Sequence, residues 1–263
     1  MIKLNLKNCI VAGRLSLTNA YIKKTAEQIL ADFCPAALKA PQAIDIDALI
    51  TEYFGYDLLY EWLSHNFSVL GLTNFSDATL TIFDSTTKKT KERDVKEKTV
   101  IIDSRMLEGS NRIRYPYTAA HECGHIVFDN LIIRAMREES RQLMMECAEE
   151  FDAVAYHSAR VQSEKDEPKW IEHYCDVFAS CIILPEVTVR MAARKILQKH
   201  GIETMQYHAH CKKDQQFALD VLAGGVAEIF ETSKEAAFYK LCDLKIIRGC
   251  RDFYDELKAK YRN

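Results

Sequence analysis

The chain has 263 residues, of which 48% are hydrophobic and 28% charged, and its formal net charge is −3. These are values of an ordinary globular protein, and they argue against disorder, a fibrous repeat, or a general electrostatic attraction to nucleic acid or an anionic membrane. The N-terminal stretch lacks the apolar core of a secretory signal, and no window approaches the roughly 18 apolar residues of a membrane span. The nine cysteines include no C-x-x-C pair. We therefore expect reduced thiols and a cytoplasmic protein.

The first 55 residues are predicted to form two helices. The first has an apolar face and is interrupted by Pro35. The second is shorter, with Asp45 or Asp47 as its cap and Gly55 as its stop. Four residues at helical spacing make the apolar face of the first helix: Ala26, Ile29, Leu30 and Phe33.

Residues 56–103 change to a strand pattern. Four short apolar runs, YDLLY, NFSVLGL, TLTIF and TVIID, are separated by polar stretches. The charged run 84–98 is predicted to be a surface hairpin or loop. This order indicates a small sheet of three or four strands ahead of the next helix.

From Pro116 onward the pattern is helical nearly to the end. Residues 134–169 form a polar helical stretch that we interpret as an insertion, and an amphipathic helix follows and ends at Pro185. We predict two parts, a main domain over residues 1–200 and a small helical subdomain over residues 201–263.

Residues 117–130 read YTAAHECGHIVFDN, with two histidines four positions apart and a glutamate after the first. Residues four apart share one face of a helix, so His121 and His125 can direct both imidazoles at one ion. In hydrolytic zinc centres with this spacing, the neighbouring carboxylate is the general base. The motif predicts a Zn²⁺ site with Glu122 as the catalytic residue.

The two residues between Glu122 and His125 indicate how this helix packs. Cys123 is turned away from both histidines and is expected in the core. Gly124 costs about 1 kcal/mol relative to alanine in a helix interior. We therefore expect another element, or a substrate, to press against the helix at Gly124.

A catalytic zinc needs a third protein ligand and an open position. The class with a third histidine would place glycine and histidine at 128 and 131, where this chain has Phe128 and Leu131. The run WIEHYCDVFA instead offers Glu172 as a ligand, with Asp176 one turn later. We expect Asp176 to accept a hydrogen bond from the far nitrogen of a liganding histidine.

Several other residues remain open as alternatives. His157 and His173 are rival third ligands, and His208 and His210 form a possible second metal site or contribute to substrate binding. The donor that stabilises the transition state is not identified by the sequence, and Tyr115 and Tyr117 are also candidates for it.

The run RIRYPYTAAHECGHIVFDN, followed by WIEHYCDVFASCIILP, resembles the ImmA/IrrE family of zinc metallopeptidases. Members typically read R-x-R-F-x-x-A-H-E-L-G-H and then E-x-x-A-N/D-x-F-A-x-x-L-L-M-P. The resemblance covers residues 20–190. This chain departs from it by the insertion and at positions expected to pack: Tyr115, Cys123, Cys175 in place of alanine, and the run IILP in place of LLMP. Other positions in register are Ala120, Gly124, Glu172, Asp176, Phe178, Ala179 and Pro185. Arg112 and Arg114 correspond to the two arginines of the family pattern but lie two residues farther from the histidine.

The resemblance implies an α+β protein, with a mainly helical, zincin-like metallopeptidase domain, a small sheet and a C-terminal helical subdomain similar to a helix-turn-helix. It also implies that His121, His125 and Glu172 bind zinc while Glu122 is the general base. Members often cleave a helix-turn-helix repressor in the cytoplasm, so a protein substrate of this kind is expected.

The C-terminal subdomain does not have the charge of a DNA-binding module. Residues 201–263 hold ten Lys or Arg and ten Asp or Glu, which favours a structural or substrate-docking role. The alternative function is a non-catalytic regulator that keeps the peptidase fold and binds a repressor or DNA. The intact Glu122 argues against that alternative.

Overall fold

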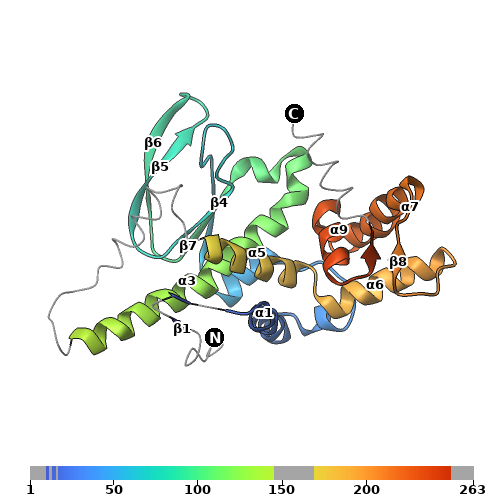
Figure 1. The fold of residues 1–263 in the computed structure, drawn as a ribbon. Helices are drawn as coiled ribbons and strands as arrows, with labels where there is room; N and C mark the ends of the chain where they lie inside the picture. Colours follow the sequence, from blue (N-terminus) through green and yellow to red (C-terminus); the bar gives the residue numbers. More distant parts are fainter. Residues whose placement is uncertain (1–9, 12–13, 16, 145–168, 250–263) are drawn as a thin grey trace. The chain divides into compact units, whose positions relative to one another are not determined.

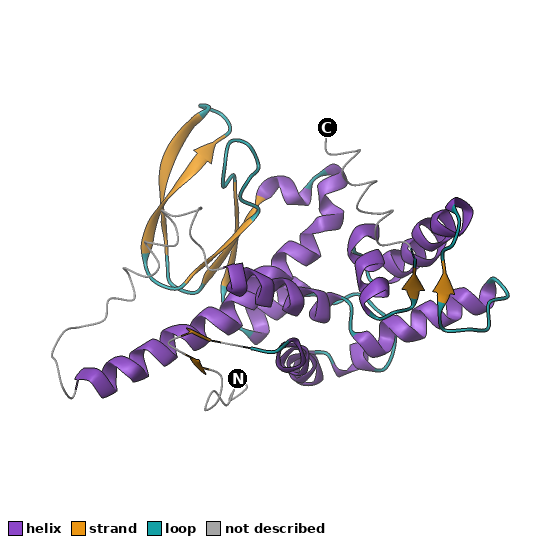
Figure 2. Ribbon diagram, viewed as in Figure 1, coloured by secondary structure: helices purple, strands orange, loops and turns teal. Residues whose placement is uncertain are grey.

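The computed structural model describes residues 10–11, 14–15, 17–144 and 169–249, with side chains described over 17–129 and 170–249. The protein has an α+β fold (Figure 1), and its described strands form small sheets of two or three strands (Figure 2). Its contacts divide the chain into two units, Met1–Thr25 with Asp45–Ala179, and Ala26–Ile44 with Ser180–Asn263.

This division differs from the boundary that the sequence suggested at residue 200. Helix α6 (Glu186–Lys199) belongs to the second unit, because it packs against α8 (Gly224–Ile229). The approach is close: a Cβ added to Gly225 would lie 2.9 Å from Cδ1 of Ile196. Tertiary packing, rather than the change in sequence pattern, sets the boundary.

Both predicted N-terminal helices are present. Helix α1 spans Asn19–Phe33, and a short 3-10 helix, η1, follows over Pro35–Leu38. The second helix is α2 (Ile46–Ala48) continued by a π-helical turn, η2 (Leu49–Tyr53). Of the two proposed caps, Asp45 is the one used, since its side chain accepts a hydrogen bond from the backbone N–H of Ala48 at 3.0 Å. A short antiparallel pair, β1 (Ile10–Val11) and β2 (Arg14–Leu15), precedes them.

A three-stranded sheet has the order β3-β7-β4. Strand β7 (Thr99–Asp103) is buried along its whole length, parallel to β3 (Asp57–Glu61) and antiparallel to β4 (Gly71–Asn74). A strand buried on both faces needs a continuous apolar run, which explains the sequence TVIID. The small predicted sheet is therefore present, with β7 at its centre.

Most of the predicted strand NFSVLGL is loop, and only its last two residues enter β4. The loop is held by Arg105, whose guanidinium lies 4.4 Å from the ring centroid of Trp62 and 4.5 Å from that of Phe67. Arg105 also donates to the backbone carbonyl of Ser64 at 2.5 Å and pairs with Asp103 at 2.7 Å. These contacts hold the loop in place without strand pairing.

The charged run 84–98 is part of a hairpin. Strand β5 (Ala78–Asp84) pairs antiparallel with β6 (Lys89–Val95), whose first six residues are exposed. The hairpin buries one apolar side, made by Leu80, Ile82 and Val95 with Ile101 of β7. It therefore shares a core with the three-stranded sheet.

Two helices carry the predicted motifs. Helix α3 (Tyr115–Met144) starts with Pro116 in its first turn, and two 3-10 turns lead into it, η3 (Ser104–Leu107) and η4 (Gly109–Arg114). Helix α5 (Lys169–Ile183) matches the predicted amphipathic helix, ending before Pro185. The ring of Phe128 meets the ring of Phe178 edge-on at 5.7 Å, which joins α3 to α5. The predicted insertion lies largely outside the described residues.

The C-terminal unit is helical, as expected for residues 201–249. It contains α6, α7 (Lys212–Phe217), a π-helical turn η5 (Ala218–Ala223), α8 and α9 (Lys234–Asp243), with a two-residue parallel pair of β8 (Tyr207–His208) and β9 (Ile247–Arg248). Its core includes Leu222, Val226, Phe230, Phe238 and Leu241. Within the described part of the chain, none of the helices combines the length and apolar character that a membrane span requires.

Candidate metal centre

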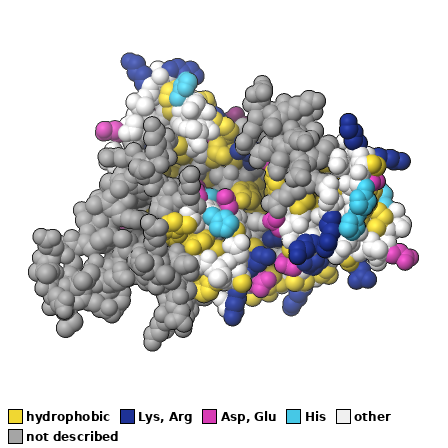
Figure 3. All heavy atoms as spheres, viewed as in Figure 1, with side chains coloured by type: hydrophobic (Ala, Val, Ile, Leu, Met, Phe, Trp, Pro, Cys, Tyr) yellow, Lys and Arg dark blue, Asp and Glu magenta, His cyan; other side chains and the backbone are white. Residues whose placement is uncertain are grey.

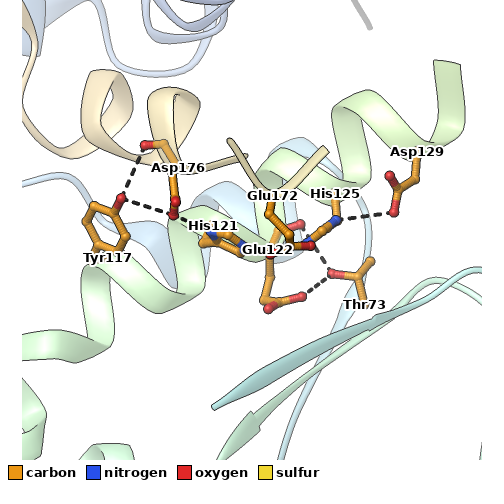
Figure 4. Close-up of polar contacts among 8 residues, drawn as sticks. All are labelled: Thr73, Tyr117, His121, Glu122, His125, Asp129, Glu172 and Asp176. Carbon is orange, nitrogen blue, oxygen red and sulfur yellow. Dashed lines mark hydrogen bonds and ion pairs between the residues drawn. The ribbon is translucent and has the colours of Figure 1, made fainter. Parts of the chain in front are cut away.

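The predicted site residues come together between α3 and α5 (Figure 4). Helix α3 carries His121, Glu122 and His125, and α5 carries Glu172 and Asp176. Figure 3 shows histidine and acidic side chains beside one another on this face, bordered by hydrophobic ones. The residues of α3 and those of α5 are at least 47 positions apart in the sequence, yet they share one small polar site.

The spacing of the donor atoms fits one metal ion. Nε2 of His121 lies 3.2 Å from Nε2 of His125 and 3.1 Å from Oε2 of Glu172. Nε2 of His125 lies 3.4 Å from Oε1 of Glu172. Tetrahedral zinc ligands with bonds of 2.0–2.2 Å are separated by about 3.3–3.6 Å. The three side chains therefore fit a Zn²⁺ ion with little rearrangement.

A sulfur atom also lies close to the histidines. The ligand atoms of His121, His125 and Cys175 all lie within 4.8 Å of one another. Glu172 is a second candidate for the third ligand beside the two histidines, because its oxygens lie 3.1 and 3.4 Å from their nitrogens. The sequence placed Cys175 in an apolar stripe; its position one turn after Glu172 was the signal that it also faces the histidines.

Each histidine has a carboxylate behind it. Nδ1 of His121 lies 3.0 Å from Oδ1 of Asp176, the contact expected from the sequence. Nδ1 of His125 lies 3.2 Å from Oδ2 of Asp129, a buried residue on the same helix. Such carboxylates orient the rings and select the tautomer whose Nε2 is free to bind a metal. Sequence reasoning missed Asp129, although its place four residues after His125 puts both on one helix face.

Glu122 is held against the sheet rather than among the ligands. Its side chain is 5% exposed, and its Oε2 accepts a hydrogen bond from Oγ1 of Thr73 at 2.7 Å. A Cβ added to Gly71 would lie only 2.6 Å from Oε1 of Glu122. Strand β4 thus leaves room for the carboxylate at Gly71 and fixes its direction at Thr73. No motif in the sequence pointed to these two residues, which approach Glu122 only through the fold.

The site attracts positive charge. Burial lowers the pKa of His121, but hydrogen bonds to Asp176 and then Glu172 raise it, with additional charge effects of Glu122 and Glu172. The net result is a pKa of about 10. In the absence of a metal ion, His121 is therefore protonated at neutral pH. A cluster of carboxylates that holds a proton on an imidazole is equally suited to hold a metal cation.

Gly124 explains how α5 comes so close. A Cβ at Gly124 would lie 2.7 Å from Cα of Cys175 and 2.9 Å from its Cβ. The sequence-based expectation that another element presses against α3 at this glycine is confirmed. Cys123, on another side of the helix, is fully buried as expected, and burial raises the pKa of its thiol.

The two tyrosines considered as transition-state donors make other contacts. The Tyr115 hydroxyl donates to Oδ1 of Asp47 and lies 2.9 Å from the hydroxyl of Tyr60. Burial, followed by these hydrogen bonds, raises the pKa of Tyr115. The Tyr117 hydroxyl donates to Oδ1 of Asp176 at 3.2 Å, on the side of His121 that faces away from His125 (Figure 4). Tyr117 thus supports the carboxylate that orients His121.

The rival histidines occupy other places. Nε2 of His173 lies 3.2 Å from Oδ1 of Asn19, whereas His157 lies outside the described residues. His208 and His210, in the C-terminal unit, stack with ring centroids 5.5 Å apart. Within the described ranges, no third side chain of a ligand type forms a compact group with these two rings.

No protein-family model matches the chain, and no curated protein matches it. The resemblance to ImmA/IrrE therefore rests on the quoted motifs alone. The geometry itself defines a group of side chains that could hold a metal ion, beside a buried carboxylate.

Proposed function

We propose that this protein is a zinc-dependent endopeptidase with its active site between α3 and α5. The observation that supports this most directly is the set of three donor atoms, from His121, His125 and Glu172, separated by 3.1 to 3.4 Å. The zincin-like character of the fold is part of the same proposal.

The residues around these ligands have the roles that hydrolysis requires. A Zn²⁺ ion bound here would polarise a substrate carbonyl and lower the pKa of a water molecule. Glu122 takes a proton from the attacking water and passes it to the leaving amine. Thr73 holds Oε2 of Glu122 at 2.7 Å, which leaves Oε1 for that proton. Asp176 and Asp129 keep the two imidazoles in the ligand orientation.

An extended peptide can be aligned by β4. In the described part of the chain, β4 pairs only with β7. The backbone N–H of Asp103 donates to the carbonyl of Leu70, so the alternation of an antiparallel ladder directs the backbone groups of Gly71 and Thr73 away from β7. A peptide added as a strand at this edge would pass beside Glu122. This favours a peptide bond over a small ester or amide as the substrate.

The nature of the substrate follows from the resemblance to ImmA/IrrE. On that basis we propose a regulatory peptidase that cuts a specific protein, such as a helix-turn-helix repressor, in the cytoplasm. The charge balance of residues 201–263 fits docking of a protein better than binding of DNA.

The test compares the zinc-loaded protein with its Glu122→Gln variant. Both are incubated with candidate repressors and with a complex mixture of unfolded proteins, with and without a chelator, and new N-termini are mapped by mass spectrometry. We expect cuts that need zinc and that disappear in Glu122→Gln while that variant still binds zinc. Equal effects of the two proteins on a repressor, without any cut, would instead support the non-catalytic regulator.

A further inference from the structure

Cys175 occupies a position that the proposed hydrolysis does not use. Its side chain is fully buried, and it lies one helical turn after Glu172 on α5. The ligand atoms of Cys175, His121 and His125 all lie within 4.8 Å of one another. A buried thiol beside two imidazoles is a typical zinc-ligand combination.

The backbone keeps this thiol beside the histidines. A Cβ added to Gly124 would lie only 2.7 Å from Cα of Cys175. The two helices are therefore in close contact at these two residues. The Sγ atom of Cys175 lies 3.1 Å from that added Cβ. Because Gly124 immediately precedes His125 in the helix, the sulfur lies against the part of α3 that carries both imidazoles.

Catalytic and structural zinc sites in proteins differ in what occupies the fourth coordination position of the metal. Catalytic sites keep three protein ligands and an open position, whereas structural sites are closed by four protein ligands. Two imidazoles, one carboxylate and one thiolate would fill all four positions here.

We propose that Cys175 is the fourth ligand of the metal in the resting protein, so that the centre is closed until the thiolate is displaced. This rests on the proposed function, since it describes the regulation of the same site. The thiolate leaves no position for water, and the resting protein is a latent peptidase. When a protein substrate docks, its carbonyl oxygen or a water molecule would take the fourth position, and the released Cys175 thiolate would take up a proton from water.

The test uses Co²⁺ as the probe, because a cobalt–thiolate bond gives an intense near-ultraviolet charge-transfer band whereas nitrogen and oxygen ligands do not. We expect the band in the Co²⁺-loaded wild-type protein and its loss in Cys175→Ala and Cys175→Ser. Cys123→Ala is the matched control and should keep the band, since Cys123 is also buried and lies within the motif but faces away from the histidines. Zinc affinity should fall by about tenfold or more in Cys175→Ala.

The outcomes separate this proposal from the proposed function. A wild-type protein that binds Co²⁺ without the band, or a band that survives in Cys175→Ala, would overturn the role of Cys175 and leave the peptidase proposal intact. Loss of the band in both Cys175 variants and its retention in Cys123→Ala would support the role, whatever the protein cleaves. If the peptidase proposal also holds, Cys175→Ala should cut its substrate faster than the wild-type protein.

Discussion

Thr73 Oγ1 donates a hydrogen bond to Oε2 of Glu122 at 2.7 Å, and the same hydroxyl lies 3.2 Å from the Glu122 backbone carbonyl. Both residues are buried. This contact ties the candidate base on α3 to strand β4, so the direction of the carboxylate depends on the sheet as well as on the helix.

Replacement of Thr73 by valine should lower peptidase activity without removing zinc. The change keeps the shape of the side chain but removes the donor to Glu122, and loss of such an orienting contact costs about 10–100-fold in activity. Turnover and zinc content of the same preparation are the measurements. Thr73→Ser keeps the hydroxyl and should retain most of the activity. If Thr73→Val were as active as the wild-type protein, the hydrogen bond would have no part in orienting the base.

Replacement of Glu122 by glutamine should abolish cleavage while zinc stays bound. The amide cannot accept the proton from water, and loss of a general base typically costs about 10²–10⁴-fold. Zinc content, measured by elemental analysis, should match that of the wild-type protein because Glu122 is not among the proposed ligands. A variant that lost zinc together with activity would show that Glu122 has a role in metal binding instead.

Replacement of Asp129 by asparagine should weaken zinc binding. Asp129 lies 3.2 Å from Nδ1 of His125, and removal of a carboxylate behind a zinc ligand costs about 10–100-fold in metal affinity. Competition with a chromophoric chelator measures the change. Asp57→Asn, at an exposed position on β3, is the matched control and should bind zinc as the wild-type protein does. An unchanged affinity in Asp129→Asn would mean that His125 is oriented by its packing alone.

Replacement of Gly124 by alanine should destabilise the protein. Alanine favours a helix by about 1 kcal/mol, but the new Cβ would lie 2.7 Å from the backbone Cα of Cys175. Overpacking of this kind costs about 1–3 kcal/mol and would separate α3 from α5. The free energy of unfolding, from denaturant titration, and the zinc affinity are the two measurements. Both should be lower than in the wild-type protein.

The matched control for that change is Gly224→Ala, in the C-terminal unit. Its added Cβ would lie 3.4 Å from the flexible end of Lys234 and 3.8 Å from the carbonyl oxygen of Leu219, both ordinary van der Waals contacts. This variant should therefore be as stable as the wild-type protein or more stable, by up to about 1 kcal/mol. Equal stability of the two variants would contradict the close contact of α3 and α5 at Gly124.

The stability of the metal-free protein should depend on the charge of His121. The folded-state pKa of about 10 is above the ordinary value of 6.5, so folding is stabilised by the protonated ring. This contribution is fully present below about pH 6.5 and is lost as the pH rises through about 10. Thermal unfolding of the protein in the presence of a chelator, at several pH values between 6.5 and about 10, measures this contribution.

Two variants isolate that contribution from other groups that titrate at high pH. His121→Asn should be less stable than the wild-type protein at neutral pH, and the difference should shrink as the pH approaches about 10. His173→Asn, which changes a histidine outside the centre, should follow the wild-type profile. A constant difference between His121→Asn and the wild-type protein across this range would contradict the raised pKa.

Local sequence patterns predicted the principal elements well. The spacing of Ala26, Ile29 and Leu30 indicated α1, and TVIID indicated the buried strand β7, because periodicity and apolar runs report which side chains must leave water. The boundary between units was less predictable. It depends on α6 packing against α8, a contact between distant segments that no local pattern encodes.

The sequence by itself determined the donor types and their helical spacing. His121 and His125 share a face of α3, and Glu172 and Asp176 share a face of α5, because a helix has a fixed repeat. Only the tertiary structure decided which distant groups meet there. Gly124 lets α5 approach and brings Cys175 beside the histidines, and Gly71 and Thr73 bring β4 to Glu122. Such contacts arise from packing between elements far apart in the chain, so spacing along the sequence does not reveal them.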